Sequence, residues 1–560
     1  MKDDIPKRFF DFLNRHTYRV ADVLHELEIS DHFNAGNIFI APPDAGEVTD
    51  EDSGEEEGGT VNNLSKGQLL SEAIATTYNG TERRDIGNFE CEQPSDSDDD
   101  DVPLKLLKSS TRCKARQQRK EKQGQEQEPR RWCKRDLPPA SRFLQWSVSK
   151  PKFLRKEWSP VSLFQLFFDD DIIEFVCDST MKYAGQKGNH TFSVDRNEMR
   201  SFLAILMISG YSTVPRRRMY WQKDDDVHNS AVKSLMARNR FEEIIQFLHV
   251  ADNTSLAAGD KMAKVRPLLR SMNERFLLYN PCQQDMSIDE SMIPYYGHHG
   301  CKQFIRGKPI RFGYKMWCLN TTTGYLIQFE PYQGAGTVDI QKSLGMGGSV
   351  IVDLIAELPS DRPYRLYFDN LFTSLKLVDV LTERGIGATG TVRVNRIEKC
   401  PLVDVKMMSK KPRGSYDYML DEEHNLIVIR WNDNSVVTVV SNCHGLQPIM
   451  NAQRWSSSQG KRIDIAQPFN IHAYNNGMGG VDRMDQNISK YRVQIRSKKW
   501  WWPFFAYIVD VSVQNAWLLY RLCPSYNQRQ LDLLGFRREI CQVCVLLHFI
   551  IMIFYVRLLK

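Results

Sequence analysis

The stretch from residue 284 to residue 394 constrains the fold most strongly, because its apolar pattern changes there from helical to strand-like spacing. Three strand patterns come first, and the second and third join through a Gly-bearing turn as a hairpin: QDMSIDESMIPYYG, RFGYKMWCLN and TTTGYLIQFEPYQG. RLYFDNLFTS then runs from a strand into the helix LKLVDVLTERG, and the short strand GATGTVRV follows. This order of strands and helix predicts a mixed sheet and a mixed α/β fold.

Helical patterns lie on both sides of this stretch. A Ser159-Pro160 helix start opens a block of periodic apolar residues that runs to about residue 280. Residues 395–467 alternate like strands and predict an all-β insertion. After Gly479-Gly480 the chain turns helical again. We expect WWWPFFAYIVDVSVQNAWLLYRL to be an amphipathic helix, too polar at Asp510, Gln514 and Asn515 to span a membrane.

Charge is distributed unevenly along the 560 residues. Residues 1–101 hold 8 Lys/Arg against 25 Asp/Glu, whereas the rest of the chain holds 66 against 44. An acidic arm on a basic body indicates a polyanionic partner for the body, with nucleic acid ahead of a membrane surface. Residues 41–158 have few apolar positions and are predicted to be disordered. Within them, residues 112–135 carry ten basic and three acidic residues, which favours a nuclear import signal.

Three carboxylates stand where a fold edge would present them. Asp289 lies inside the apolar strand pattern MSIDE, Asp369 closes the strand RLYFD, and Asp482 starts a helix with Asp485 one turn later. If the first two strands are neighbours, these acids converge and could bind two Mg²⁺ or Mn²⁺ ions for phosphoryl transfer. The alternative for Asp369 and Asp482 is helix capping, whereas Asp289 needs a partner inside an apolar strand.

Other constellations carry weaker signals. His298, His299 and Cys301 could hold a metal, but a Gly-flanked His pair is more typical of polar surface. Cys541 and Cys544 have zinc-knuckle spacing without a second pair, so no zinc is expected.

No Walker A motif and no GxGxxG after a strand occur, so the sequence lacks the signatures of nucleotide hydrolysis and dinucleotide binding. The 12 cysteines are scattered and predict reduced thiols, and the apolar run 543–556 is too short for a membrane span.

Three basic clusters, interleaved with aromatic residues, favour a nucleic-acid partner. Lys and Arg would neutralise phosphates and the aromatics could stack on bases, although a solvated face with core aromatics is the alternative. The candidate DNA-binding residues are Arg216, Arg217, Arg218, Lys302, Arg306, Lys308, Arg311, Arg492, Arg496, Lys498, Lys499 and Trp502.

Three blocks of the chain resemble the catalytic blocks of piggyBac-type transposases, and they occur in the same order: SIDESMIPYYGHHGCKQFIRGKPIRFGYKMW, YRLYFDNLFTSLKL and NNGMGGVDRMDQNISKYR. The resemblance covers about residues 159–540. It implies an RNase H-like core whose catalytic triad is Asp289, Asp369 and Asp482, with Asp485 as the adjacent fourth acid. It also implies Mg²⁺ or Mn²⁺, hairpin intermediates and joining into TTAA targets.

The resemblance divides the chain as follows: 1–158, acidic then basic arm; 159–283, helical dimerisation and DNA-binding domain; 284–394, catalytic core; 395–467, β-rich insertion; 468–486, last part of the core; 487–540, second part of the helical domain; 541–560, an apolar tail where the family has a zinc domain.

Double-stranded DNA and a second copy of the chain are the expected partners, in the nucleus and away from membranes. Ser53, Ser95 and Ser97 each precede an acid by three residues, so an acidophilic kinase is a further expected partner. The two candidate functions are a transposase and a domesticated, non-catalytic DNA- or chromatin-binding protein.

Overall fold

The computed structural model describes residues 130–139, 143, 146–147, 149–305, 308–334, 337, 340–341, 343–456 and 459–558, with side chains to residue 546, and four strands before residue 90. The chain divides into two compact units, Met1–Arg130 and Arg131–Lys560. The serines proposed for phosphorylation and most of the basic stretch 112–135 lie outside the described residues.

The first unit contains one small antiparallel sheet. Its strands are β1 (Tyr18–Arg19), β2 (Ala35–Ile40), β3 (Glu72–Asn79) and β4 (Glu82–Ile86), in the order β1-β3-β2 with β4 on β3. Strands β3 and β4 lie within residues 41–158, the segment predicted to be disordered. Their β-branched and aromatic residues (ATTY in β3) suit a strand, although the flanking sequence is highly charged.

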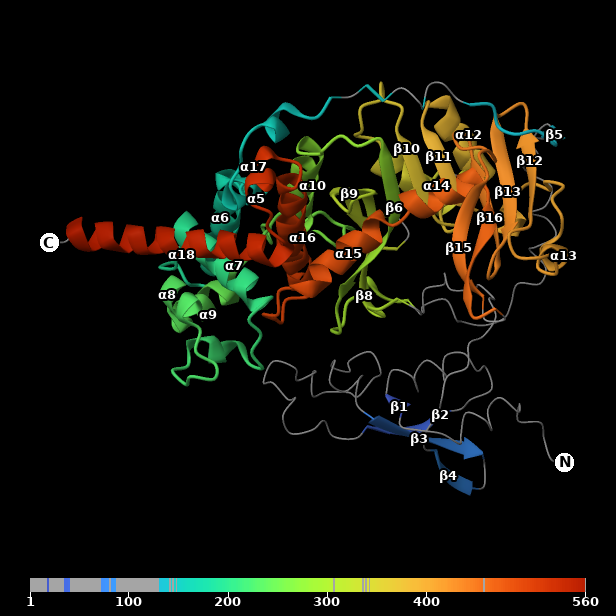
Figure 1. Ribbon diagram of the computed structural model, residues 1–560. Coiled ribbons are helices and arrows are strands. Elements are labelled where there is room, and N and C mark those ends of the chain that lie inside the picture. The colour runs from blue at the N-terminus through green and yellow to red at the C-terminus, as the bar shows by residue number, and fades with distance from the viewer. Residues whose placement is uncertain are drawn as a thin grey trace. The chain divides into compact units, whose positions relative to one another are not determined.

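The second unit is built on a ten-stranded mixed sheet (Figure 1). Its strand order is β5-β12-β13-β14-β11-β10-β6-β8-β7, with β9 also pairing with β8. The strands are β5 (Trp132–Cys133), β6 (Asp285–Pro294), β7 (Lys302–Phe304), β8 (Phe312–Thr321), β9 (Leu326–Pro331), β10 (Arg365–Phe368), β11 (Gly387–Thr391), β12 (Tyr416–Asp421), β13 (Leu426–Asn432) and β14 (Val436–Ser441).

The centre of this sheet has the order β9-β8-β6-β10-β11. The first three strands are antiparallel, and β6, β10 and β11 are parallel. The predicted hairpin of β8 and β9 and the predicted strand–helix–strand unit are both present. This order and direction confirm the mixed α/β fold with an RNase H-like core.

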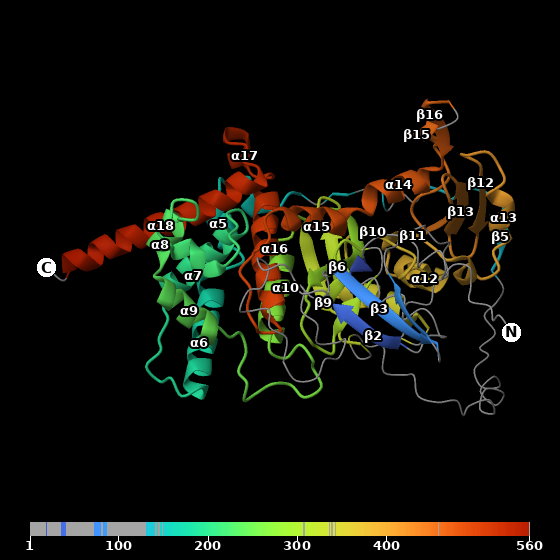
Figure 2. The same ribbon diagram turned by 90° about the horizontal axis from the view of Figure 1, so that it is seen from below.

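Helices pack on both faces of the sheet. In Figure 2, α14 (Phe469–Gly477) and α15 (Gly480–Lys490) run along one face, and α12 (Leu375–Glu383) lies on the other. Helix α11 (Gly345–Leu354) lies between β9 and β10 in the chain and was not predicted. Its sequence GMGGSVIVDL is rich in glycine, which disfavours helix in isolation, but Gly347 packs at the backbone of Leu371, where a side chain would not fit.

The β-rich segment 395–467 joins the central sheet. Strands β12, β13 and β14 continue it through the antiparallel pairing of β14 with β11. Only β15 (Met450–Ser456) and β16 (Lys461–Gln467) form a separate ribbon. The segment also contains the short 3-10 helix Val394–Arg396 at its start and α13 (Val405–Met408), so it is not all β. The division of the chain into domains at 395 and 467 stays a prediction.

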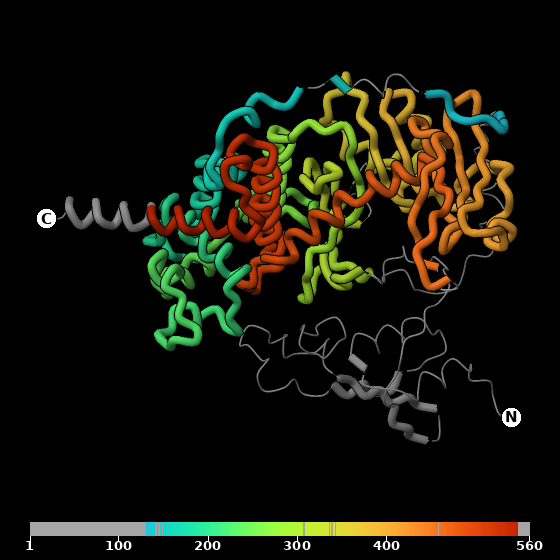
Figure 3. The backbone as a smooth tube through the Cα atoms, viewed as in Figure 1, coloured from blue at the N-terminus to red at the C-terminus, as the bar shows by residue number. Residues whose placement is uncertain are grey.

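A helical region is assembled from two distant parts of the chain, which lie together in Figure 3. The first part holds the 3-10 helices Lys152–Arg155 and Arg217–Trp221 with α5 (Pro160–Phe164), α6 (Asp170–Gln186), α7 (Arg196–Ser209), α8 (Ser230–Leu235), α9 (Arg238–Phe247) and α10 (Arg266–Leu278). The second part holds α16 (Trp502–Tyr520), α17 (Pro524–Gln528) and α18 (Leu533–Leu558).

The first of these helices begins where the sequence predicts. Ser159 accepts a hydrogen bond from the backbone of Ser162, and Pro160 occupies the first turn. Packed structure nevertheless starts earlier than the predicted residue 159. Cys133 pairs with Leu420 at the edge of the sheet, and Leu154 is fully buried. These contacts are formed with distant parts of the chain, so local composition does not indicate them.

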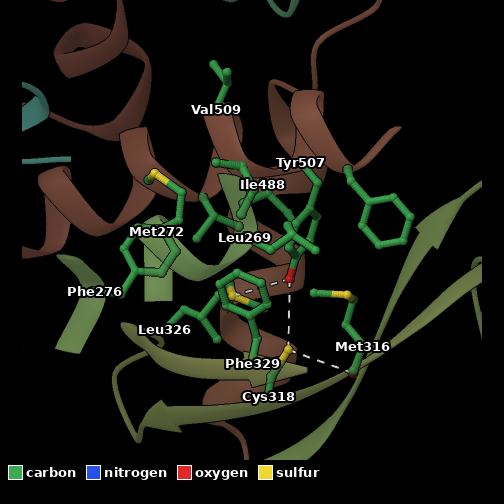
Figure 4. Packing of buried hydrophobic residues seen from close by; sticks show 14 of the residues in the cluster. Leu269, Met272, Phe276, Met316, Cys318, Leu326, Phe329, Ile488, Tyr507 and Val509 are labelled. Atoms are coloured by element: carbon green, nitrogen blue, oxygen red, sulfur yellow. Dashed lines mark hydrogen bonds between the residues drawn. The ribbon is translucent and has the colours of Figure 1, made fainter. Parts of the chain in front are cut away.

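Helix α16 is buried on nearly every side, which corrects the amphipathic helix predicted from its polar residues. Figure 4 shows Tyr507 and Val509 of this helix among the buried hydrophobic residues. Gln514 donates to Gly324 O at 3.0 Å, and Asn515 bonds both backbone groups of Leu326. Asp510 accepts from Arg537 at 2.8 Å. These hydrogen bonds hold α16 against the β8–β9 hairpin and against α18, although Gln514 Oε1 is buried without a hydrogen-bond partner among the residues that the structure describes. Within the described residues, no helix is both long and apolar enough to cross a membrane.

Candidate active site: an acid cluster at the end of the parallel strands

Asp289 and Asp369 lie side by side. Strands β6 and β10 are parallel, and their last paired residues are Ile288 and Phe368. The next residue on each side is an aspartate: Asp369 directly follows the end of β10, and Asp289 lies inside β6, which continues to Pro294. The two carboxylates therefore lie beside each other where the parallel pairing of the two strands ends. The predicted proximity of these two strands is confirmed.

The turn after Asp369 is held by several hydrogen bonds. The Asp369 carboxylate accepts from the backbone N–H of Leu371 at 2.9 Å within the turn, whereas the N-cap of α12 is Ser374, so the helix-capping alternative is wrong for Asp369. Arg396 donates from Nη1 to three carbonyl oxygens of this turn, those of residues 370, 371 and 373 at 2.9, 3.0 and 3.2 Å. The sequence alone did not identify Arg396, which ends the 3-10 helix Val394–Arg396 after β11. We conclude that Arg396 fixes the backbone that carries Asp369.

Helix α15 brings the remaining acids to β6. Ser287, Asp289 and Ser291 share one face of β6, because side chains alternate along a strand. A Cβ on Gly480 would lie 2.3 Å from Ser287 Oγ and 2.4 Å from Thr321 O, so only glycine allows this close approach. Further along the helix, Asp485 accepts a 2.6 Å hydrogen bond from Ser291 Oγ. Asp289 lies between the two serines and therefore faces the helix that carries Asp482 and Asp485.

The pKa values of the cluster show how strongly the acids act on one another. Burial raises the pKa of Asp289, and the charges of Glu290 and Asp369 raise it further. Burial, with Glu290 next, raises the pKa of Asp369 to about 6. Burial raises that of Asp485 to about 6, opposed by the Ser291 hydrogen bond. These carboxylates are therefore crowded in a poorly solvated region, which disfavours their full ionisation without a cation.

Tyr474 of α14 is affected by the charges of three of these acids, including Asp482. Burial raises its phenol pKa first, and the charges of Asp369, Asp289 and Asp482 raise it further. Asp482 itself is exposed, at the beginning of α15. The four predicted acids are thus carried by neighbouring elements: β6, the turn after β10, and α15, which packs against β6.

Two further residues complete the cluster. Glu290, which the sequence analysis did not single out, has one carboxylate oxygen paired with Lys308 at 3.8 Å, while its Oε2 is buried without a hydrogen-bond partner. Lys308, predicted as a DNA contact, also donates to Glu290 O at 3.3 Å. The structure places this ammonium among the acids.

The donors of this cluster are all carboxylates, which are the ligands that Mg²⁺ and Mn²⁺ favour. The excess of buried negative charge and the unpaired Glu290 oxygen fit a divalent cation. As the side chains stand, however, no three His, Cys, Asp or Glu residues in the described part of the chain are arranged to hold a metal ion. The donor chemistry therefore fits, whereas the side-chain positions are those of a site in which Lys308 supplies the positive charge.

The histidine and cysteine alternatives have structural roles. His299 stacks on Trp500 with ring centroids 4.1 Å apart, and burial lowers its pKa to about 4. It is therefore not the polar surface residue that its Gly-flanked setting predicts. Cys541 is buried in α18, where its Sγ contacts Ala204 O at 3.8 Å. Burial raises the pKa of Cys541 to about 12, which suits a core thiol.

The first and third basic clusters meet in space. Arg217 donates to Arg496 O at 3.0 Å and pairs with Glu242 at 2.7 Å. The exposed cations around this contact are Arg216, Arg218, Arg496 and Lys498, with the half-buried Arg492. We call these five residues the basic surface. The charge of Arg492 opposes the rise that burial causes in the pKa of Asp485, so this arginine acts electrostatically on the acid cluster.

Two predicted DNA contacts are structural instead. Lys499 donates to the carbonyl oxygens of Ile245 and Gln246 at 3.0 and 2.9 Å, at the C-terminal end of α9. Such a position suits a cation, because the last carbonyls of a helix lack partners. Trp502 is only 4% exposed and donates to Ile495 O at 2.9 Å. Both side chains point into the protein, which the basic sequence around them concealed.

The described residues of the second basic cluster, Lys302, Lys308 and Arg311, differ in their exposure to solvent. Burial lowers the pKa of the half-buried Lys302, so this residue is a poor candidate for a surface phosphate contact. Arg311 is exposed just before β8. Arg306 lies outside the described residues.

Comparison with known proteins agrees with this geometry. A family model described as Transposase IS4 matches residues 159–517. The chain is 42% identical over 514 residues to human PiggyBac transposable element-derived protein 2, across 90% of this chain and 81% of the relative. It is 41% identical over 533 residues to human PiggyBac transposable element-derived protein 3, across 94% and 87%. A solved piggyBac transposase synaptic complex with hairpin DNA matches with a TM-score of 0.59 at 22% identity, across 71% of this chain and 82% of that chain. At that identity the likeness concerns the fold alone.

Proposed function

This chain belongs to the piggyBac transposase family, and we propose from that membership and from the acid cluster that it cleaves DNA strands and joins them to a target. The observation that carries the proposal is the adjacency of Asp289 and Asp369 where the parallel pairing of β6 with β10 ends, together with the contact of α15, which carries Asp482 and Asp485, with β6. The family resemblance extends the proposal to hairpin intermediates and TTAA targets, and to action in the nucleus as a homodimer.

Asp289, Asp369 and Asp482 would hold two Mg²⁺ or Mn²⁺ ions, with Asp485 beside them. When bound, these ions would activate the attacking oxygen and stabilise the leaving one in an in-line phosphoryl transfer. Arg396 would keep Asp369 in place through the turn that it binds. Ser291 would orient Asp485 through its hydrogen bond. This contact suits Asp485 to a supporting role beside the metal ligands.

The basic surface would hold the DNA backbone next to these acids. Its arginines and lysine are exposed or half-buried and can neutralise phosphates. Tyr296 lies close enough to Arg492 and Arg496 for both charges to lower its pKa, which burial raises. This tyrosine lies just beyond the end of β6, the strand that carries Asp289, so the basic surface and the acids would contact one stretch of DNA.

The test is a cleavage assay on transposon-end duplexes and pre-formed hairpins in Mg²⁺ or Mn²⁺. Asp289→Ala and Asp369→Ala should abolish product, whereas Asp404→Ala, at the start of the remote helix α13, should not. Binding to the same DNA without any Asp289-dependent product would refute the enzyme and support the domesticated DNA-binding protein. The observation that favours this second function is that no three acids stand ready to hold a metal within the described residues.

A further inference from the structure

Lys308 occupies an unusual place for a lysine in a basic loop. It lies between β7 and β8, and its side chain is only 29% exposed. Its ammonium nitrogen is 3.3 Å from the backbone oxygen of Glu290 and 3.8 Å from the Glu290 carboxylate. A lysine that contacted only DNA phosphates would extend into solvent, so these contacts need another explanation.

The Lys308 ammonium acts electrostatically on every acid of the cluster. Burial lowers its pKa, but four carboxylates outweigh burial and leave the pKa raised: those of Asp289, Glu290, Asp482 and Asp485. For the fifth acid, Asp369, burial raises the pKa, and the charge of the same ammonium opposes that rise. A single positive charge is thus shared among five carboxylates that α15, β6 and β10 bring together.

We propose that Lys308 is a built-in counter-cation of the acid cluster, which holds the five carboxylates together without metal and which divalent cations must displace in order to bind. The proposal rests on the proposed function in one respect, namely that the acids bind divalent cations. The new element is that Lys308 sets the affinity of these acids for divalent cations.

The physical basis is competition for one region of negative potential. An ammonium carries one charge on a flexible four-carbon stem, so it can neutralise the acids in one state and leave them in another. A divalent cation carries twice the charge and takes oxygen ligands at short distance, so it gains more from the same acids. Removing the ammonium should therefore weaken the metal-free protein and strengthen the binding of metal.

Lys308→Met in the full chain tests this inference, with Lys308→Arg retaining the charge. Lys315→Met is the matched control, because Lys315 lies on the nearby strand β8 but its ammonium stacks over Tyr332, 4.6 Å from the ring centroid. Two quantities are measured: the urea midpoint in EDTA, and the Mn²⁺ dissociation constant by electron paramagnetic resonance.

We expect Lys308→Met to unfold at lower urea in EDTA and to bind Mn²⁺ about tenfold more tightly or better. Lys308→Arg should stay closer to the unsubstituted protein, and Lys315→Met should change neither quantity. Equal or weaker Mn²⁺ binding by Lys308→Met would overturn the inference. If Lys308→Met does not fold, Lys308→Met with Glu290→Gln removes both members of the contacting ion pair and should recover folding, and a failure to recover would also overturn the inference.

The proposed function fails separately from this inference. If the unsubstituted protein binds no Mn²⁺, or binds it equally well after Asp289→Ala, metal-dependent cleavage by these acids is refuted. The counter-cation role is then decided by the EDTA measurement alone, where equal midpoints for Lys308→Met and the unsubstituted protein overturn it.

Discussion

Gly480→Ala should separate the helix that carries Asp482 and Asp485 from the strand that carries Asp289. The added Cβ would lie 2.4 Å from Thr321 O, a backbone atom that cannot swing aside, whereas ordinary contact begins at 3.4 Å. Helix α15 must therefore move outward by about 1 Å, since overpacking is relieved by backbone shifts that cost about 1–3 kcal/mol. A displacement of about 1 Å at a reacting site can lower the rate about 100-fold.

Gly479→Ala is the matched control. At this neighbouring residue a Cβ would meet nothing nearer than the Arg483 guanidinium at 4.0 Å, and φ is −78°, which alanine adopts readily. We expect its free energy of unfolding to change by less than about 1 kcal/mol, the range of a helix N-cap substitution.

Urea unfolding gives the stability of both variants, hydrogen exchange of the α15 amides reports the position of the helix, and cleavage of transposon-end DNA reports the site. Gly480→Ala should be less stable, exchange faster in α15 and cleave far more slowly than Gly479→Ala. If the two variants agree in stability and exchange, the close contact between α15 and β6 is not what positions the acids.

Three other substitutions test the account of the buried charges. Asp369→Asn should raise the unfolding free energy at pH 7.5 by about 1–3 kcal/mol in EDTA, because the folded pKa is raised to about 6 and ionisation therefore costs stability above that pH. The gain should fade as the pH falls towards 4, and a gain that persists at pH 4 would contradict this explanation. Lys499→Met should lower the unfolding free energy by about 1–3 kcal/mol through lost hydrogen bonds to α9, whereas the exposed Lys498→Met should weaken DNA binding in a filter assay without changing stability. The reverse pattern would restore Lys499 as a DNA contact. Arg537→Met should cost about 3–5 kcal/mol by leaving a buried carboxylate unpaired, and Arg538→Met, one residue on and exposed, should be neutral in the same urea titration. Equal midpoints for these two arginine variants would show that the buried ion pair contributes little.

Local patterns predicted most of the secondary structure. The capped start at Ser159, the β8–β9 hairpin and the helix α12 follow from signals within a few residues of each element. Helix α11 was missed because its glycines disfavour helix locally, and it forms because those glycines allow close packing against the turn after Asp369. Propensity is a weak signal that tertiary contacts override.

The residues of the candidate site were also predicted only in part from local sequence. The sequence placed Asp289, Asp369 and Asp482 correctly on their elements, since an acid within an apolar strand or at the end of an element is visible locally. It did not distinguish Lys499, which caps a helix, from Lys498, which faces solvent, because both lie in one basic run.

The sequence by itself determined the periodicities of the elements, the separation of acidic from basic charge and the family to which the chain is similar, because each depends on residues near one another in the chain or on their order. Only the tertiary structure decided that Glu290 and Lys308 join the acids, that Arg396 holds the turn of Asp369, and that α16 buries its polar face. Burial and charge neutralisation depend on distances between residues that are far apart in sequence, and these distances exist only once the sheet and its helices have packed.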